Sequence, residues 1–258
     1  MKHIAMIASV RSGTTMLRMI MNSHKDVCGW PEIFLRSNLG LNFTIFEHIA
    51  EEDTIEYMRD IKNLDNKYKI YRENMDEVSA GYKVGSKVTV VDVKYGQIVP
   101  HRSCDWSGAE YVIDSILSSD CKILHLKRRN AVALEMASRL AELNPYTNYK
   151  EPYSVRKITL EPNEFYEAVE FNHRQTEKIS GIICKSSDNI EIAYEDIIDE
   201  RGLFSEKMAK KLSEFFCIDD QFDRNVPTKK ASPCPKEAIA NYLDVYQRFK
   251  GTKFEHMI

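Results

Sequence analysis

The segment from Ile4 to Ser23 constrains the fold most strongly, because it changes from one structural periodicity to another within a few residues. A short, nearly continuous apolar run, HIAMIAS, predicts a buried strand of a parallel sheet. The turn RSGTT follows it, and apolar residues then recur at helical spacing from Leu17 to Met21. The sequence therefore predicts a strand, a tight turn and a helix in direct succession.

Strand and helix patterns alternate along the rest of the chain. The segments KVTVVDVK (87–94), CKILHL (121–126) and NIEIAY (189–194) predict further strands, and NAVALEMASRLAEL (130–143) predicts a helix. The charged segment 43–77 has a mostly helical pattern and is interpreted as a solvated covering element. We therefore expect a single α/β domain over residues 1–258, in which helices flank a central, mostly parallel sheet.

Composition narrows the possible partners. The net charge of −3 and pI near 6.2 give no global reason to expect a nucleic acid or a membrane surface as partner. No apolar run approaches the roughly 18 residues of a membrane span, and Arg11 interrupts the apolar start before a signal-peptide core forms. The six cysteines show no paired short spacing, which argues against a zinc site or a disulfide framework. A cytoplasmic protein with reduced thiols is expected.

The turn after the first predicted strand is suited to holding an anion. The first backbone N–H groups of a helix are unpaired, and the helix dipole adds partial positive charge there. Gly13 would let the backbone approach a phosphate closely. Ser12, Thr14 and Thr15 would add hydroxyl donors, and Arg11 would add a forked cation. On this stretch alone, a plain helix cap by Ser12 or Thr14 is an equally open interpretation.

A nucleoside triphosphate loop of the Walker type fits the turn poorly. That loop has the pattern G-x-x-x-x-G-K-[ST], in which the lysine reaches the β and γ phosphates and the hydroxyl holds magnesium. Ala8 stands where the first glycine would be, and Thr14 stands where the lysine would be. Nucleoside triphosphate hydrolysis is therefore disfavoured.

The stretch VRSGTTML resembles the 5′-phosphosulfate loop of sulfotransferases that use 3′-phosphoadenosine 5′-phosphosulfate (PAPS). The family pattern is P-[KR]-S-G-T-T-x-L, and Val10 replaces its proline. The resemblance implies a P-loop-like fold and binding of PAPS, with 3′-phosphoadenosine 5′-phosphate (PAP) as the product. It also implies that Arg11 and the Ser12–Thr15 loop neutralise the leaving 5′-phosphate.

Two later segments resemble the family's other nucleotide motifs. CKILHLKRRNAVALEMASRL resembles the 3′-phosphate motif, which implies phosphate binding by Arg128 or Arg129 and by Ser138. The spacing from Arg129 to Ser138 is one position longer than the family pattern, so both arginines stay candidates. IEIAYEDII resembles the element whose tyrosine, here Tyr194, lies near the adenine. Lys229 and Lys230 look like the basic loop that closes over the 3′-phosphate.

The resemblance also suggests catalytic residues. NSHKDVCGWPEIF resembles a stretch of the bacterial carbohydrate-type branch in which a glutamate, here Glu32, acts as base. Lys94 matches a lysine placed near the reacting sulfonate. The cytosolic branch has a histidine two positions after that lysine, where this chain has Gly96. His24 and His101 are the alternative bases.

The reaction implied is an in-line, metal-independent transfer of the sulfuryl group to an acceptor hydroxyl. A sugar or glycolipid head group is the first acceptor considered, and an aromatic loop could stack against it (Tyr146, Tyr149 and Tyr153). Two other functions stay open at this point. One is a module that binds PAPS or PAP without transfer, and the other is a kinase-like phosphotransferase.

Overall fold

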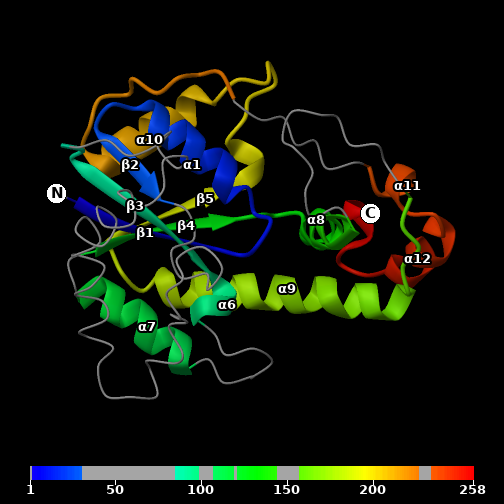
Figure 1. Cartoon of the computed structure of the whole chain (residues 1–258). Coiled ribbons are helices and arrows are strands. Elements are labelled where there is room, and N and C mark those ends of the chain that lie inside the picture. The colour runs from blue at the N-terminus through cyan, green and yellow to red at the C-terminus, as the bar shows by residue number, and fades with distance from the viewer. Residues whose placement is uncertain (1, 31–84, 99–106, 119–120, 144–156, 227–233) are drawn as a thin grey trace.

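In the part of the chain that the structure describes, a parallel five-stranded sheet forms the centre of the computed structural model (Figure 1). The structure describes residues 2–30, 85–98, 107–118, 121–143, 157–226 and 234–258. The strands are β1 (Lys2–Ala8), β2 (Val27–Trp30), β3 (Val88–Lys94), β4 (Cys121–Lys127) and β5 (Asn189–Ala193). Their order is β2-β3-β1-β4-β5, so β1 is the central strand. The predicted α/β class with a mostly parallel sheet is confirmed.

Helices cover both faces of this sheet. The described helices are α1 (Thr14–Ser23), α6 (Tyr95–Ile98), α7 (Ser107–Ser118), α8 (Ala131–Leu143), α9 (Pro162–Ile183), α10 (Glu206–Phe216), α11 (Pro235–Ala238) and α12 (Tyr242–Phe249), with 3₁₀ turns η1 (Tyr194–Asp196) and η2 (Glu255–Met257). The α1 and α10 helices pack against one face, and α7 and α9 pack against the other. Burial on both faces explains why β1 is apolar from Ile4 to Ala8 rather than alternating. The β3 strand is also buried throughout, although Thr89, Asp92 and Lys94 are polar.

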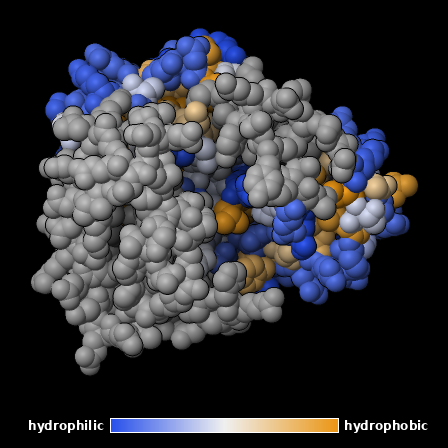
Figure 2. All heavy atoms as spheres, viewed as in Figure 1, coloured by the Kyte–Doolittle hydropathy of each residue, from blue (hydrophilic) through white to orange (hydrophobic). Residues whose placement is uncertain are grey.

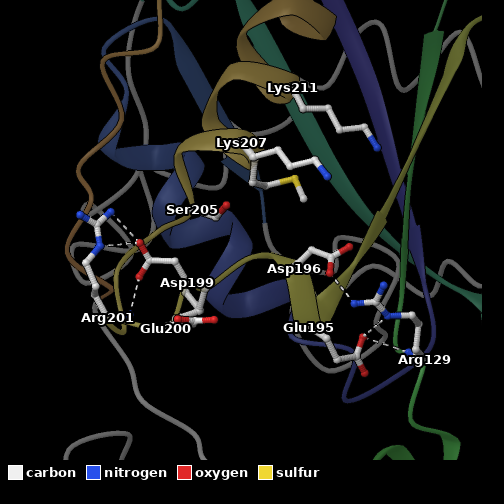
Figure 3. A pocket seen from close by; sticks show the side chains of 11 residues that line it. Arg129, Glu195, Asp196, Asp199, Glu200, Arg201, Ser205, Lys207 and Lys211 are labelled. Carbon is white, nitrogen blue, oxygen red and sulfur yellow. Dashed lines mark hydrogen bonds and ion pairs between the residues drawn. The ribbon is translucent and has the colours of Figure 1, made fainter.

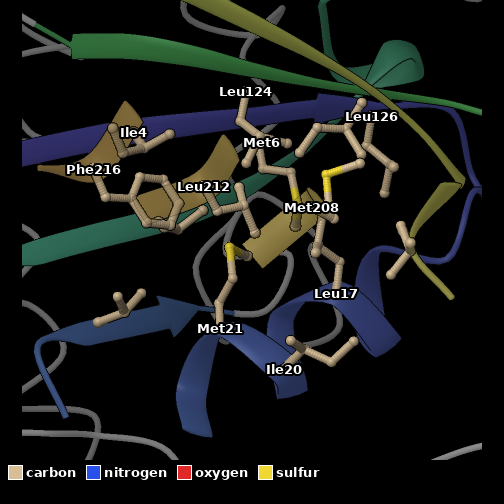
Figure 4. Packing of buried hydrophobic residues seen from close by; sticks show 14 of the residues in the cluster. Ile4, Met6, Leu17, Ile20, Met21, Leu124, Leu126, Met208, Leu212 and Phe216 are labelled. Carbon is tan, nitrogen blue, oxygen red and sulfur yellow. The ribbon is translucent and has the colours of Figure 1, made fainter. Parts of the chain in front are cut away.

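Alternate residues of β1 fill two separate core clusters. Ile4 and Met6 point toward α1 and α10, where they meet Leu17, Leu212 and Phe216 (Figure 4). All five side chains are 1% exposed or less. Ala5 and Ile7 of the same strand contact the α7 and α9 side. Because side chains alternate along a strand, this one strand anchors both layers and fixes the position of the loop that follows it.

The long helix α9 links the sheet to a second helical cluster. Its amino-terminal end is capped by the Glu161 carboxylate, which accepts a hydrogen bond from the Glu164 N–H at 2.7 Å. Near that end Phe165 packs on Phe249 of α12, with ring centroids 5.6 Å apart. The carboxyl-terminal end contributes Ile179 to the core beneath the sheet. Its 22 residues span about 33 Å, and α8 packs against it.

The strand register brings three strand ends to one edge. Ala8, the last residue of β1, pairs with Lys94 of β3 and with Leu126 of β4. The loops that leave β1, β3 and β4 therefore start side by side at the carboxyl edge of the sheet. Ligands of open α/β sheets bind at this edge.

A polar network under the sheet joins α6, β4, β5 and α9. The Tyr95 hydroxyl lies 2.6 Å from His125 Nε2, and His125 Nδ1 lies 3.3 Å from the Glu191 carboxylate. Ser180 and Lys127 also donate to Glu191, at 2.8 and 2.5 Å. Burial raises the pKa of Tyr95, so the phenol stays protonated and donates to His125. The bond from His125, with those from Lys127 and Ser180, holds the pKa of Glu191 well below its usual range.

This network predicts an acid-sensitive contribution to stability. A carboxylate whose pKa is lowered by folding stabilises the protein above its unfolded pKa, and that stabilisation is lost as pH falls. We expect Glu191→Gln to have a lower urea midpoint than the wild type near neutral pH, with the difference shrinking from about pH 5 to about pH 3. The exposed Glu206→Gln is the control and should shift the midpoint little at any pH. A Glu191→Gln difference that stays constant with pH would contradict the assignment.

The described surface is mostly hydrophilic on the face shown in Figure 2. Apolar atoms gather at its right edge, over the region of α11 and α12, and Leu243 of α12 is 73% exposed. Single exposed apolar side chains of this kind are normal on protein surfaces. Among the helices of the described segments, none has the length and apolar character needed to cross a membrane.

Candidate functional site

The loop between β1 and α1 has a backbone shape that only a few residue types adopt easily. Arg11 and Gly13 have φ angles of 61° and 88°, both in the left-handed region. The first helical hydrogen bond runs from the Leu17 N–H to the Gly13 carbonyl at 3.0 Å, so Gly13 is the residue that caps α1. Since glycine has no side chain, no side-chain cap covers the start of this helix. The first-turn N–H groups and the helix dipole thus favour an anion here.

The hydroxyl groups of the loop have different orientations. Ser12 is fully buried and donates to the Ser9 carbonyl at 2.7 Å, which ties the turn together from inside. Its side chain therefore stabilises the loop and does not cap α1. Thr14 is buried at the first position of α1, and Thr15 is half-buried. Arg11 is exposed. The structure thus places the loop backbone and Thr14 in the site, whereas the Ser12 hydroxyl is turned away.

Tyr194 lies directly on the glycine of the loop. A Cβ atom at Gly13 would be 2.4 Å from Cδ2 of Tyr194 and 2.5 Å from Cε2. The guanidinium of Arg128 lies 4.8 Å from the centre of the same ring, and its Nη1 donates to the Arg11 carbonyl at 3.3 Å. Burial lowers the pKa of Arg128, while Tyr194 and Glu195 act in the opposite sense. Arginine stays a cation under such conditions, because its usual pKa is far above neutral pH.

The neighbouring arginine faces a different group of residues. Arg129 forms ion pairs with Asp196 and with Glu195 of η1 (Figure 3). The Glu195 carboxylate also accepts hydrogen bonds from the backbone N–H groups of Arg129 and Asn130, at 3.1 and 3.0 Å. These contacts fix the turn before α8. A hollow of about 740 Å³ lies beside them, and α10 lysines line its other side. Of the two arginines, Arg128 is the one at the loop.

Ser138 lies further along α8. Its hydroxyl donates to the carbonyl of Leu134 in its own helix at 3.4 Å. The residue is about 10 Å along the helix axis from Ala131, where α8 begins. The structure therefore does not bring the Ser138 hydroxyl to the basic turn in this state.

A buried ion pair that also contacts a hydroxyl lies beneath the loop. The Lys94 ammonium donates to the Thr14 hydroxyl at 2.6 Å and to both oxygens of Asp92 at 2.8 Å. Lys94 and Asp92 are 4% and 3% exposed. Sequence reasoning missed Asp92, although a lone aspartate in the apolar run VTVVDVK is a detectable signal. Residues two apart share one face of a strand, so the pair could have been expected on the same side of β3.

His24 has a structural environment at the far end of α1. It is fully buried, its Nδ1 accepts a hydrogen bond from the Asp26 N–H, and its Nε2 donates to Asp219 at 2.5 Å. This bond holds the pKa of Asp219 below its usual range. Since α1 has ten residues, His24 is about 15 Å from the loop. It is therefore badly placed to act as the base of this site.

Several predicted residues lie outside the described segments. They are Glu32, His101, Tyr146, Tyr149, Tyr153, Lys229 and Lys230. Their roles stay predictions, as does the extent of the single domain.

Fold and site together define a P-loop-like α/β protein, because a glycine loop joins the central strand of a parallel sheet to a helix at the ligand-binding edge. In comparisons of the sequence, no family model and no curated protein matches the chain. Among solved structures, the chain is similar to a shikimate kinase from Bacteroides thetaiotaomicron. The two are 13% identical, the alignment covers 84% of this chain and 99% of that one, and the TM-score is 0.41.

Proposed function

We propose that this protein is a sulfotransferase that moves the sulfuryl group of PAPS to a hydroxyl acceptor. One observation carries the proposal. The segments that resemble the family's nucleotide motifs come from distant parts of the sequence, yet Tyr194 and Arg128 both contact the Arg11–Gly13 turn. The three segments follow the neighbouring strands β1, β4 and β5, so the fold brings these resembling motifs to one edge of the sheet. The carbohydrate or glycolipid nature of the acceptor belongs to the proposal as well.

The loop residues act on the leaving group. In the reaction, the bond from sulfur to the 5′-phosphate oxygen breaks as the acceptor oxygen bonds to sulfur, and negative charge builds on the leaving phosphate. Preorganised donors aimed at that charge lower the barrier. In this proposal Arg11 and the N–H groups from Ser12 to Thr15 supply such donors, and the Lys94 ammonium adds positive charge beneath them. Glu32 takes the acceptor's proton.

The remaining groups hold the rest of the nucleotide. Arg128 binds the 3′-phosphate, as the resemblance of its segment implies, and its guanidinium is already oriented by Tyr194. The Tyr194 ring lies beside the nucleotide near the adenine. Lys229 and Lys230 close over the 3′-phosphate, and Arg129 and Ser138 are its other candidate ligands.

Calorimetric titration with PAP tests the nucleotide site. The experiment uses the full chain in chelator, with ATP as the competing nucleotide. We expect metal-independent PAP binding that is tighter than ATP binding and that weakens at least about tenfold in Arg11→Ala. Lys210→Ala, which removes an exposed cation of α10, is the matched control and should bind normally. Absence of PAP binding would overturn the proposal.

Transfer itself needs a second assay. Incubation with PAPS carrying labelled sulfate and a panel of sugars and glycolipids should give a labelled acceptor, and Glu32→Gln should reduce its formation without weakening PAP binding. If PAP binds but no acceptor is labelled, the non-catalytic nucleotide-binding module becomes the better description.

The two neighbouring arginines should differ in their effect on binding. Arg128→Ala removes the guanidinium that lies at the loop, so we expect PAP affinity to fall about 10- to 100-fold, the value of a charged hydrogen bond. Arg129→Ala removes exposed ion pairs to η1, and we expect less than about a fivefold change. Calorimetric titration of both variants with PAP measures which arginine contributes more to binding. A larger loss in Arg129→Ala would assign the 3′-phosphate to Arg129 instead.

A further inference from the structure

The Lys94 ammonium occupies a site built from hard oxygen ligands. An ammonium group has three N–H donors, and its described acceptors are the Thr14 hydroxyl and the two oxygens of the Asp92 carboxylate, all within 2.8 Å. Both side chains are buried, as is Lys94 itself. A buried charge is tolerated when it is paired in this way. The arrangement is thus a cation held between a loop hydroxyl and a strand carboxylate.

Phosphate-loop enzymes use the same two ligand types for a metal ion. Their Mg²⁺ is held by the hydroxyl that follows the loop and by a further aspartate, and it neutralises the charge on the transferred group. Here the hydroxyl comes from Thr14, the first residue of the helix and one position before the Walker hydroxyl, and Asp92 lies on β3, which pairs with β1. The hydroxyl and the carboxylate contact one Nζ atom, so they converge on one point.

The strand register explains why the pair lies at this point. Val88 and Val90 of β3 face the α1 and α10 core, and Asp92 and Lys94 continue the same face toward the carboxyl edge. Ala8 pairs with Lys94, and its small side chain ends β1 where the loop begins. The apolar face of the strand therefore changes to a charged pair directly beneath the loop.

We propose that the Lys94 ammonium is a built-in cation held by the two ligand types with which phosphate-loop enzymes hold a divalent metal ion, and that Asp92 is the positioning residue that fixes it. The inference deepens the proposed function, since it assigns the charge that a metal would otherwise supply to the anion at the loop. It predicts that removal of the ammonium converts the site into a divalent cation site, because the hydroxyl and carboxylate remain.

Manganese binding by the purified full chain tests this inference. Mn²⁺ replaces Mg²⁺ at oxygen sites, and electron paramagnetic resonance measures its free concentration. We expect Lys94→Ala to bind Mn²⁺ at least about tenfold more tightly than the wild type, and Lys94→Ala/Asp92→Asn to lose the gain. No gain in Lys94→Ala, or an Asp92-dependent Mn²⁺ site in the wild type, would overturn the inference. The Mn²⁺ assay contains no nucleotide, so its outcome does not depend on whether the protein binds PAP.

Stability supplies a second measurement, because Lys94→Ala leaves a buried carboxylate without its cation. Lys94→Ser is the second variant, since its hydroxyl adds an oxygen ligand. Both variants should melt at a lower temperature than the wild type in chelator and at a higher temperature once Mn²⁺ is added, because a ligand that binds only the folded state stabilises it. The wild type should show no such shift. The inference is wrong if Mn²⁺ does not raise the melting temperature of these variants. It is equally wrong if a variant that fails to fold in chelator also fails to fold in Mn²⁺.

Discussion

Replacement of Gly13 by alanine is expected to abolish anion binding at the loop and to lower the free energy of unfolding by about 2–4 kcal/mol. The φ angle of 88° strains any residue with a side chain, and the new Cβ would lie 2.4 Å from the Tyr194 ring. The ring has little room to move, because Arg128 lies over it at 4.8 Å. Either the loop or the ring must therefore leave its position, and the site loses its shape.

Gly85→Ala is the matched control for this variant. Gly85 has the same backbone conformation, with φ of 89°, but open space where the Cβ would be. Gly85→Ala should therefore lower the free energy of unfolding only by the backbone strain, about 1 kcal/mol. The double variant Gly13→Ala/Tyr194→Ala removes the clash and should regain part of the stability but not the PAP affinity. Urea unfolding and calorimetry measure the two effects. Equal losses in Gly13→Ala and Gly85→Ala would show that the contact with Tyr194 carries no energy.

The strands of the sheet were largely predictable, because a strand that is buried on both faces is a short, mostly apolar run in the sequence. The runs HIAMIAS, KVTVVDVK, CKILHL and NIEIAY coincide with β1, β3, β4 and β5 to within a residue or so. The strand β2 (Val27–Trp30) was missed, since four residues are too short to show a period. The order of the strands in the sheet could not be predicted either. The β1 and β3 strands are more than 80 residues apart in sequence, and periodicity does not report which strands pair.

The site was predictable in its parts but not in its contacts. The pattern RSGTT indicated an anion loop, yet only the folded chain shows that the Ser12 hydroxyl turns inward to Ser9. Two arginines in a row look alike in a sequence. Their roles separate because the acidic residues of η1 hold Arg129, whereas Arg128 turns toward the loop. Side-chain direction at a turn depends on which partners lie nearby in space.

Lys94 and Asp92 are expected to be the most strongly coupled pair of side chains in the site. Lys94→Met leaves a buried carboxylate and Asp92→Leu leaves a buried ammonium, so each should lower the free energy of unfolding by about 3–5 kcal/mol. The double variant contains neither charge and should lose only about 1–2 kcal/mol, far less than the sum. Urea unfolding in chelator measures the cycle.

An exposed ion pair provides the control for that cycle. Lys185 and Glu110 lie 3.3 Å apart with side chains 69% and 44% exposed, and alanine at either should change stability by less than about 1 kcal/mol with little coupling. Because the double variant Lys94→Met/Asp92→Leu keeps the fold but has no cation beneath the loop, it should bind PAP weakly in spite of its stability. If the double variant loses as much free energy of unfolding as the two single variants together, the two charges act independently. One that binds PAP normally would mean that the ammonium serves the fold and not the anion.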